Sequence, residues 1–379
     1  MPQSFMSLEG ATDRREHPDR QFQGVRIVDP DLGSCQRRRS QCVSDRPRAF
    51  MERDRNIAKR SHNDRGIAML KSTVLKGAGI GLTLLLASAP GQAADLGAKD
   101  EPIKLAMLEW TGQHISTHIA GQLLEKLGYK VEYVTAGSFP QFSGLADGSL
   151  SASLESWSNN VGEIYPKMLA EKKIDNIGSL GLQTQEGWMY PKFMEQVCPG
   201  LPDWTALEKP ECVQALSTPE TAPNGRLLDY PADWGSRGAT IIADNNLPYT
   251  AVPAGSEGAL VAELEASEAA KTPLLMMFWG PHYALAENDV GWVKMPPCKE
   301  DTNEHCIRPP DALKTVWPGL GAKWPAALAF LKAFKMDAAA QQKMALAIDK
   351  DGKNIDDVVK DWIDKNEAVW KPWEDAAKR

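Results

Sequence analysis

Tryptophans stand out among the residues of this chain that could do chemistry. The sequence has 12 tryptophans against 7 tyrosines and 9 phenylalanines in 379 residues. A tryptophan ring offers the best aromatic face to a cation. Rings that converge from several strand ends would cage a quaternary ammonium group, which has no hydrogen bond to donate. Five tryptophans are candidates for such a cage: Trp110, Trp157, Trp188, Trp234 and Trp279.

Core packing is the alternative for each of these rings. The segment KTPLLMMFWGPHYAL, residues 271–285, is an apolar run of strand length that stops at Trp279-Gly280-Pro281-His282. A single tryptophan at a strand end is more often a core residue than part of a site. Several tryptophans in equivalent positions favour a site.

Signatures of other chemistry are scarce. The sequence lacks a G-x-S-x-G elbow, a P-loop, a G-x-G-x-x-G turn and a C-x-x-C pair. His114 and His118 share a helix face, but no third metal ligand accompanies them. The glycine of DKDGKNIDD, residues 349–357, comes too early for an EF-hand, so we predict a junction between helices. We expect no metal, no cofactor and no enzymatic activity. An exported enzyme acting on a related amine and a structural or sensory protein are the competing classes.

Charge excludes another class of partner. The net charge is −7 and the isoelectric point is near 5.5. Nucleic acid binding needs clustered lysine and arginine, so we expect no nucleic acid partner.

The amino-terminal part differs in composition from the rest. Residues 1–68 are polar and rich in arginine, and are predicted to be a non-native or disordered leader. Lys71 and Lys76, a short apolar core at 80–87 and small residues at 89–93 then predict a secretory signal peptide over 69–93. Met69 would be the natural start and the mature chain would begin near Ala94. The alternative is a true leader with an internal anchor.

Cysteine usage agrees with export. Four cysteines follow the predicted signal peptide, and loop size favours the local pairs Cys198–Cys212 and Cys298–Cys306 among three possible pairings. Each disulfide would stabilise its polar loop by roughly 2–3 kcal/mol. A zinc site is the competing interpretation, but only His305 is near and neither spacing fits one.

Strands and helices alternate where the candidate tryptophans stand. We predict strands at 102–110, 131–136 and 151–157, with helices at 111–127 and 139–148 between them. This order implies an α/β fold with a mostly parallel sheet. Ligands of such sheets lie beyond the carboxyl ends of the strands, where Trp110, Trp157 and Trp279 are expected. Further predictions are a strand, turn and helix within 226–245, a helix at 256–271 and helices from Trp324 onward.

Five motifs in this order resemble one family of proteins. They are LLEKLGYKVEY, GLADGSLSASLESW, PADWGSRG, FWGPH and DGKNIDDVVKDWI. The chain from Ile103 to Trp373 resembles the substrate-binding proteins of glycine betaine, proline betaine and choline ABC transporters. The resemblance implies a type II periplasmic-binding fold: two α/β lobes with the ligand cleft between them. Lobe 1 would comprise 102–193 and 307–379, and lobe 2 would comprise 194–306. It also implies a periplasmic monomer that delivers its ligand to a membrane permease and its ATPase subunits.

The resemblance assigns roles to individual residues. Trp157 would be a cage wall from lobe 1, and Trp234 and Trp279 would be walls from lobe 2. The backbone N–H groups of Gly235 and Ser236 would hold a substrate carboxylate at a helix start. Trp110 and Trp188 match aromatic positions of choline-binding members, and His282 would lie beside Trp279.

Departures from the family pattern affect the expected ligand. Ser158-Asn159-Asn160-Val161 stands where betaine-binding relatives often have a histidine. Glu109 and Glu155 adjoin cage tryptophans, and Glu155 would share a strand face with Trp157 unless it points to solvent or a neighbouring helix. An acid in the cleft would attract a cation or bond a hydroxyl or N-oxide, and would repel a carboxylate.

We therefore expect an extracytoplasmic solute-binding protein for a trimethylammonium osmolyte. Glycine betaine is the first expectation, and choline and trimethylamine N-oxide are the alternatives. Both disulfide-closed loops, 198–212 and 298–306, are expected to reshape the rim of the cleft.

Overall fold

The computed structural model describes residues 95–298 and 305–379, all within one compact unit of the chain. The predicted leader and signal peptide lie outside the described residues. Among the residues described, no helix is both long enough and apolar enough to span a membrane.

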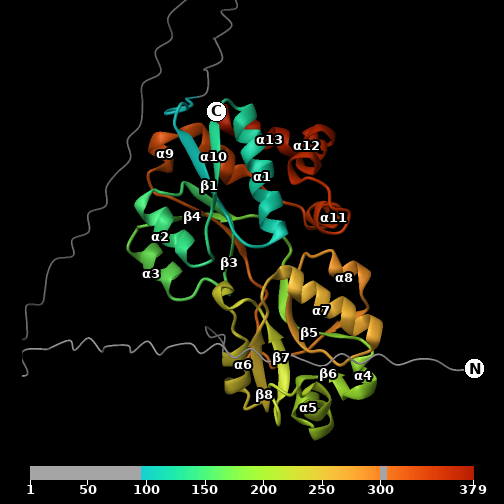
Figure 1. Cartoon of the computed structure of the whole chain (residues 1–379). Coiled ribbons are helices and arrows are strands. Elements are labelled where there is room, and N and C mark those ends of the chain that lie inside the picture. The colour runs from blue at the N-terminus through green and yellow to red at the C-terminus, as the bar shows by residue number, and fades with distance from the viewer. Residues whose placement is uncertain (1–94, 299–304) are drawn as a thin grey trace, which may run out of the picture. The chain divides into compact units, whose positions relative to one another are not determined.

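The described residues form two five-stranded sheets (Figure 1). The first has the order β2-β1-β3-β11-β4. Its strands are β1 (Pro102–Met107), β2 (Lys130–Thr135), β3 (Ala152–Trp157), β4 (Asp175–Ser179) and β11 (Ala312–Val316). The second has the order β10-β5-β9-β7-β8. Its strands are β5 (Gln185–Pro191), β7 (Gly225–Asp229), β8 (Tyr249–Pro253), β9 (Met276–Gly280) and β10 (Val290–Trp292). We call the sheets, with their helices, lobe 1 and lobe 2.

Each sheet has a parallel part and an antiparallel part. In lobe 1, β1 is parallel to β2 and β3, and β11 is antiparallel to β3 and β4. In lobe 2, β7 is parallel to β8 and β9, and β5 is antiparallel to β9 and β10. The predicted α/β architecture with two lobes is confirmed.

The predicted boundary between the lobes at 193/194 is wrong. β5 was assigned to lobe 1, but its hydrogen-bond partners are β9 and β10 of lobe 2. The chain therefore crosses between β4 and β5, at residues 180–184, and returns between β10 and β11. The Thr184 hydroxyl donates to the carbonyl of Pro310 and joins the two crossings.

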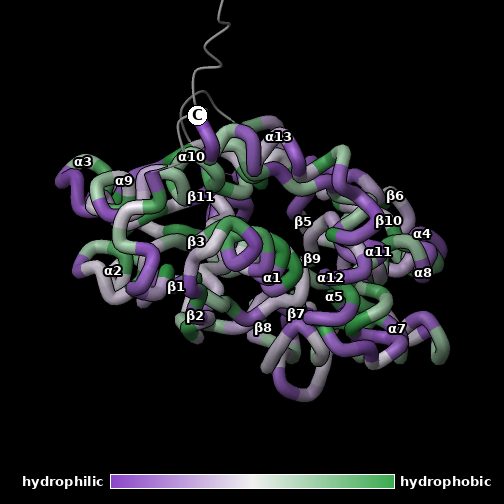
Figure 2. Tube along the Cα trace, turned by 90° about the horizontal axis from the view of Figure 1, so that it is seen from above, coloured by the Kyte–Doolittle hydropathy of each residue, from purple (hydrophilic) through white to green (hydrophobic). Residues whose placement is uncertain are grey.

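Helices cover the sheets because each helix has one apolar face. In α1 (Thr111–Lys126) the buried apolar residues include Ile115, Ile119 and Leu123, at helical spacing. Thr111 is the first residue of this helix, and the capping position is Trp110. Hydrophobic and hydrophilic residues alternate along the helices in Figure 2, as expected for one buried face.

The remaining helices follow the two-lobe division (Figure 1). Lobe 1 also contains α2 (Pro140–Asp147), α3 (Ile164–Ala170), α9 (Leu320–Lys323), α10 (Pro325–Ala333), α11 (Ala338–Asp349), α12 (Ile355–Lys365) and α13 (Glu367–Ala377). Lobe 2 contains α4 (Met194–Val197), α5 (Pro210–Leu216), α6 (Gly238–Asp244), α7 (Glu257–Ala270), α8 (Ala284–Glu287) and the 3₁₀ turns η1 (Trp204–Glu208) and η2 (Ala232–Trp234), with β6 (Pro199–Pro202) outside the sheets.

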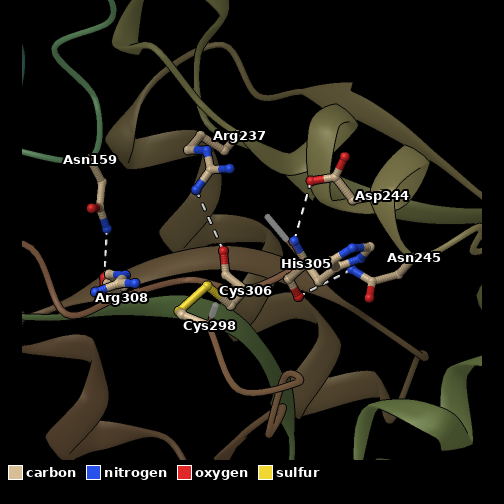
Figure 3. The surroundings of a disulfide bond; sticks show 8 residues. All are labelled: Asn159, Arg237, Asp244, Asn245, Cys298, His305, Cys306 and Arg308. Atoms are coloured by element: carbon tan, nitrogen blue, oxygen red, sulfur yellow. Dashed lines mark hydrogen bonds between the residues drawn. A yellow bond between two sulfur atoms is a disulfide. The ribbon is translucent and has the colours of Figure 1, made fainter. Parts of the chain in front are cut away.

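Both predicted disulfides are present. Cys198 and Cys212 join the end of α4 to α5, with Cα atoms 4.9 Å apart. Cys298 and Cys306 are bonded with Cα atoms 5.2 Å apart. The second disulfide closes the segment that returns from lobe 2 to lobe 1 (Figure 3).

Candidate functional site: an aromatic cleft with a buried carboxyl group

Aromatic rings from both lobes line one cavity. Trp110 and Trp157 come from lobe 1, and Tyr230, Trp234 and Trp279 come from lobe 2. The other described lining residues are Ser138, Gln141, Ser156, Asn160, Val161 and Glu186. None of these described residues is a lysine or an arginine. We call this cavity the aromatic cleft.

The rings touch one another around the cleft. The centroids of Trp110 and Trp234 are 5.4 Å apart, which joins the two lobes. Trp234 and Trp279 meet edge to face at 5.5 Å, and Tyr230 lies 5.6 Å from Trp279. These spacings are typical of favourable aromatic pairs. Four of the five candidate tryptophans therefore line one cleft, and Trp188 does not.

Strand ends position these rings, as the sequence predicted. Trp157 is the last residue of β3, and Trp279 is the penultimate residue of β9. Trp110 stands between β1 and α1, and Trp234 ends the turn η2 that follows β7. The carboxyl ends of the parallel strands in both sheets thus face the same cleft.

Glu155 holds two of the rings from behind. Its Oε1 accepts hydrogen bonds from the indole N–H groups of Trp110 at 2.8 Å and Trp157 at 3.1 Å. Its Oε2 accepts from Ser116 and Gln341. Burial raises the pKa of Glu155 above its ordinary value, and these four donors oppose that effect. Glu155 was predicted to contact ligand, but it is 1% exposed and is not among the residues that line the cleft.

Glu186 is the carboxyl group that does line the cleft. Side-chain amides of Asn159 and Asn160 donate to its two oxygens, each at 2.8 Å. Burial raises the pKa of Glu186 above its ordinary value, against the lowering effects of Asn160, Asn159 and Tyr230. The Tyr230 hydroxyl is buried beside Glu186, and this carboxyl group in turn helps to raise the pKa of Tyr230.

The segment that follows the second disulfide supports Glu186 through Asn159. The Asn159 amide that donates to Glu186 also donates to the carbonyl of Arg308, at 2.6 Å. On the other side, Asn245 of lobe 2 donates to the carbonyl of His305 (Figure 3). His305 and Arg308 therefore contact residues of lobe 2 and lobe 1, respectively.

Sequence reasoning missed Glu186 because of the direction of β5. The rule that ligands lie beyond carboxyl ends holds for parallel strands. β5 is antiparallel to β9, so its amino end reaches the cleft, where Glu186 is directly opposite Trp279. Side chains of opposed residues share one face of a sheet. The signal in the sequence was an acid at the start of a strand that also carries Trp188.

Three predicted site residues lie away from the cleft lining. Trp188 is fully buried in the core of lobe 2, two residues deeper in β5 than Glu186. Glu109 is exposed beside Ser138, and partial burial and Asp233 raise its pKa. His282 is buried behind Trp279, with ring centroids 5.0 Å apart.

Gly235 and Ser236, the predicted carboxylate binders, also lie outside the lining. The Ser236 hydroxyl donates to Asp229 and accepts from the N–H of Gly238. Gly235 has φ +80° and packs against the backbone of Asn160 in lobe 1. These residues shape the turn between Trp234 and α6 and bring the lobes together.

The histidine pair of α1 does not form a metal site in the described structure. The Nε2 atom of His114 is 2.6 Å from the carbonyl oxygen of Leu108. His118 pairs with Asp356 at 2.7 Å and stacks on Tyr133. Among the described residues, no group of three potential ligands could hold a metal ion.

Two α/β lobes, a double crossover and an aromatic cleft between them define an extracytoplasmic type of solute-binding protein. Residues 101–365 match the family described as the substrate binding domain of the ABC-type glycine betaine transport system. The chain belongs to this family, whose members bind a substrate for the permease and ATPase components of an ABC importer.

Individual relatives agree with that assignment. A trimethylamine N-oxide-binding protein from Pelagibacter ubique is 29% identical over 286 residues, which cover 72% of this chain and 90% of that protein. A glycine betaine/L-proline-binding protein from Borrelia burgdorferi has the same fold, with TM-score 0.62, 18% identity, and coverage of 73% of this chain and 98% of its own. A choline-binding protein solved with choline has TM-score 0.61, 14% identity and coverage of 73% and 96%.

Proposed function

We propose that the aromatic cleft binds trimethylamine N-oxide. The three methyl groups would lie against the tryptophan faces, which attract a trimethylammonium group. The N-oxide oxygen would accept hydrogen bonds from the Tyr230 hydroxyl and from the protonated carboxyl of Glu186. The observation that carries the proposal is this pair: a cleft-lining carboxyl group with a raised pKa and the buried hydroxyl of Tyr230 beside it. The Pelagibacter relative supports the same ligand class.

Choline is the second candidate. Its hydroxyl would donate to Glu186 in the ionised form, and its cationic head would be attracted by the same carboxylate. Glycine betaine, our first expectation from the sequence, is supported by the family description. Its carboxylate would have to meet a protonated Glu186, because no described lining residue carries a positive charge.

Calorimetric titration of the protein from Ala94 onward with the three compounds tests the proposal. We expect trimethylamine N-oxide to bind most tightly. Trp157→Ala and Trp279→Ala should each weaken binding about tenfold, since a desolvated cation–π contact contributes ~1–2 kcal/mol. Trp317→Ala, which alters a tryptophan outside the cleft lining, is the control. Tighter binding of choline or glycine betaine would replace trimethylamine N-oxide as the ligand.

The pH dependence separates the roles of Glu186. If the carboxyl donates to an N-oxide, affinity decreases as pH rises through its raised pKa. If the carboxylate accepts from choline, affinity increases over the same range. Glu186→Gln keeps a donor without a titrating proton, so it should abolish either dependence. Glu109→Gln, at an exposed acid outside the lining, is the matched control.

Export and the absence of catalysis complete the proposal. We propose that residues 69–93 direct export to the periplasm and that the mature chain begins near Ala94, which agrees with the two disulfides. Amino-terminal sequencing of the periplasmic protein should find that start and no residue from 1–68. We also propose that the ligand leaves unchanged. Nuclear magnetic resonance spectra of each compound after incubation should show no product.

A further inference from the structure

Glu257 connects the two lobes at the first turn of α1. It is the first residue of α7 in lobe 2. Its Oε2 accepts a hydrogen bond of 2.9 Å from the backbone N–H of Thr111, the first residue of α1 in lobe 1. The bond spans 146 positions of sequence.

The start of α1 lacks a cap from its own sequence. Its capping position is occupied by Trp110, which makes no capping hydrogen bond, and its first turn contains no acidic residue. The first N–H groups of a helix have no partner within the helix and carry partial positive charge. Glu257 provides the missing acceptor from the other lobe. It is not needed to cap α7, where the Ser256 hydroxyl accepts from the N–H of Ala259.

His282 fixes the second oxygen of the same carboxylate. Its Nε2 lies 3.1 Å from Glu257 Oε1, and its Nδ1 accepts from the backbone N–H of Ala284. The acceptor role of Nδ1 places the proton on Nε2, so the neutral ring donates to Glu257. Both oxygens of Glu257 are therefore held, and the carboxylate points at α1.

The two hydrogen bonds of Glu257 connect tryptophans that line the aromatic cleft from opposite lobes. His282 packs against Trp279 with ring planes at 83°. Thr111 directly follows Trp110, which is a wall from lobe 1. The path from Trp279 through His282, Glu257 and Thr111 to Trp110 links rings from opposite lobes.

We propose that Glu257, held by His282, is a closure latch that caps α1 only when the lobes come together. It is a positioning residue, because it lies outside the described cleft lining and acts through Trp110 and Trp279. The latch depends on the proposed function in one respect only, which is that trimethylamine N-oxide is the ligand used to test it. Two further bonds cross at this side: Gln342 donates to the carbonyl of His282, and the exposed Lys350 pairs with Glu287. The side chain of Glu257 is less exposed than those of Lys350 and Glu287, so dissolved salt screens its interactions less.

Dissociation kinetics of Glu257→Ala test the latch. We expect trimethylamine N-oxide to dissociate about five- to tenfold faster, as measured by stopped-flow tryptophan fluorescence, because a lost cap costs ~1 kcal/mol and the dipole interaction adds to it. The melting temperature without ligand should stay unchanged, since an open form does not make the bond. Glu257→Gln, which keeps an acceptor oxygen, should restore part of the wild-type rate.

Glu263→Ala is the matched control. Glu263 lies on the same helix but pairs with Arg226 in its own lobe. Equal dissociation rates for Glu257→Ala and Glu263→Ala would overturn the latch, as would a lower melting temperature for Glu257→Ala with an unchanged rate.

Failure of the latch and failure of the ligand assignment can be told apart. If wild-type protein binds choline or glycine betaine instead, the ligand proposal fails and the rates are compared with that compound. Small-angle scattering without ligand gives a readout that needs no ligand at all. Because the open form does not make the bond, the latch predicts equal radii of gyration without ligand for wild type, Glu257→Ala and Glu263→Ala. A larger radius for Glu257→Ala alone would contradict a latch that forms only on closure.

Discussion

At the residue scale, two buried carboxyl groups have different roles in the site. Glu155 fixes the indole groups of Trp110 and Trp157 from behind, and Glu186 faces the open space of the cleft. An indole N–H can only donate, so the two rings together require an acceptor at Oε1 of Glu155. The cleft thus has a carboxyl that positions its rings and another that is available to a ligand.

We predict that Glu155→Gln weakens both folding and binding. The amide places a donor where one oxygen accepted, so at least one buried donor loses its partner, at a cost of about 1–3 kcal/mol. Ligand affinity should fall because an indole ring is no longer fixed. Thermal denaturation and calorimetry measure the two effects. Wild-type affinity in this variant would show that the rings are held by packing alone.

We predict a pH-dependent effect on stability for Glu186→Gln. Burial raises the pKa of Glu186 above 4.5 in the folded chain. Stability from this group is therefore present below pH 4.5 and is lost as pH rises through the folded pKa. The variant loses an acceptor for Asn159 or Asn160 at every pH, but it carries no buried charge. Relative to wild type, its melting temperature without ligand should therefore rise between pH 4 and pH 7, and a difference that stays constant over this range would contradict the assignment.

Sequence reasoning located the rings better than the acids. Trp110, Trp157 and Trp279 follow from predicted strand ends, which apolar runs and turn residues mark in the sequence, and Trp234 follows from the family resemblance. The contacts of Glu155 depend on Ser116 and Gln341, the second of which is 186 positions away. The place of Glu186 depends on the direction of β5, which a local pattern does not contain. Long-range partners and strand direction are therefore what the sequence alone could not provide.

At the scale of elements, β11 and α10 are joined by a buried lysine. Lys314 of β11 donates to the carbonyls of Leu331 and Phe334 at 2.7 Å and of Lys332 at 3.0 Å. These are carbonyls at the end of α10, which the helix cannot satisfy itself. Burial lowers the pKa of Lys314 to about 7.

We predict that Lys314→Met destabilises lobe 1 by about 2–4 kcal/mol, because buried carbonyls lose their donor. Chemical denaturation measures this loss. Lys332→Met, at an exposed position of α10, is the control and should change stability little. An equally small loss for Lys314→Met would mean that water can replace the ammonium group.

Element types were predictable where the pattern was long. The helix at 256–271 and the strands around Trp157 and Trp279 agree with α7, β3 and β9. The loop between Cys198 and Cys212, for which we predicted only a disulfide, contains β6, η1 and the start of α5. Elements of four to seven residues carry too few positions for a periodic pattern, and their packing is decided by the rest of lobe 2.

At the scale of the whole described chain, Gly235 sets how closely the lobes approach. A Cβ atom at this position would lie 2.6 Å from the carbonyl oxygen of Asn160 and 2.8 Å from the ring of Phe139. Both neighbours belong to lobe 1. Gly235 therefore acts on closure and on the distance between Trp234 and the rings of the other lobe.

We predict that Gly235→Ala reduces ligand affinity at least tenfold, because the methyl group keeps the lobes apart. The substitution also adds backbone strain of ~1 kcal/mol at positive φ. Gly352→Ala is the matched control, since Gly352 has φ +67° with no atom within 4 Å of an added Cβ. Calorimetry and melting should show similar destabilisation in both variants and weak binding only in Gly235→Ala. Equal affinities would exclude a role in closure.

The position of β11 also sets an order in which the molecule can assemble. β11 lies between β3 and β4 in the sheet of lobe 1, yet it is made after every strand of lobe 2. The lobe 2 sheet is contiguous from Gln185 to Trp292, so it can form while the carboxyl-terminal part of the chain is still being synthesised or translocated. The strands β1 to β4 must wait for residues 312–316 before their sheet is complete. The last-made segment thus gives lobe 1 the strand that joins β3 to β4, and a chain interrupted before Ala312 would keep one sheet whole and leave the other in two pieces.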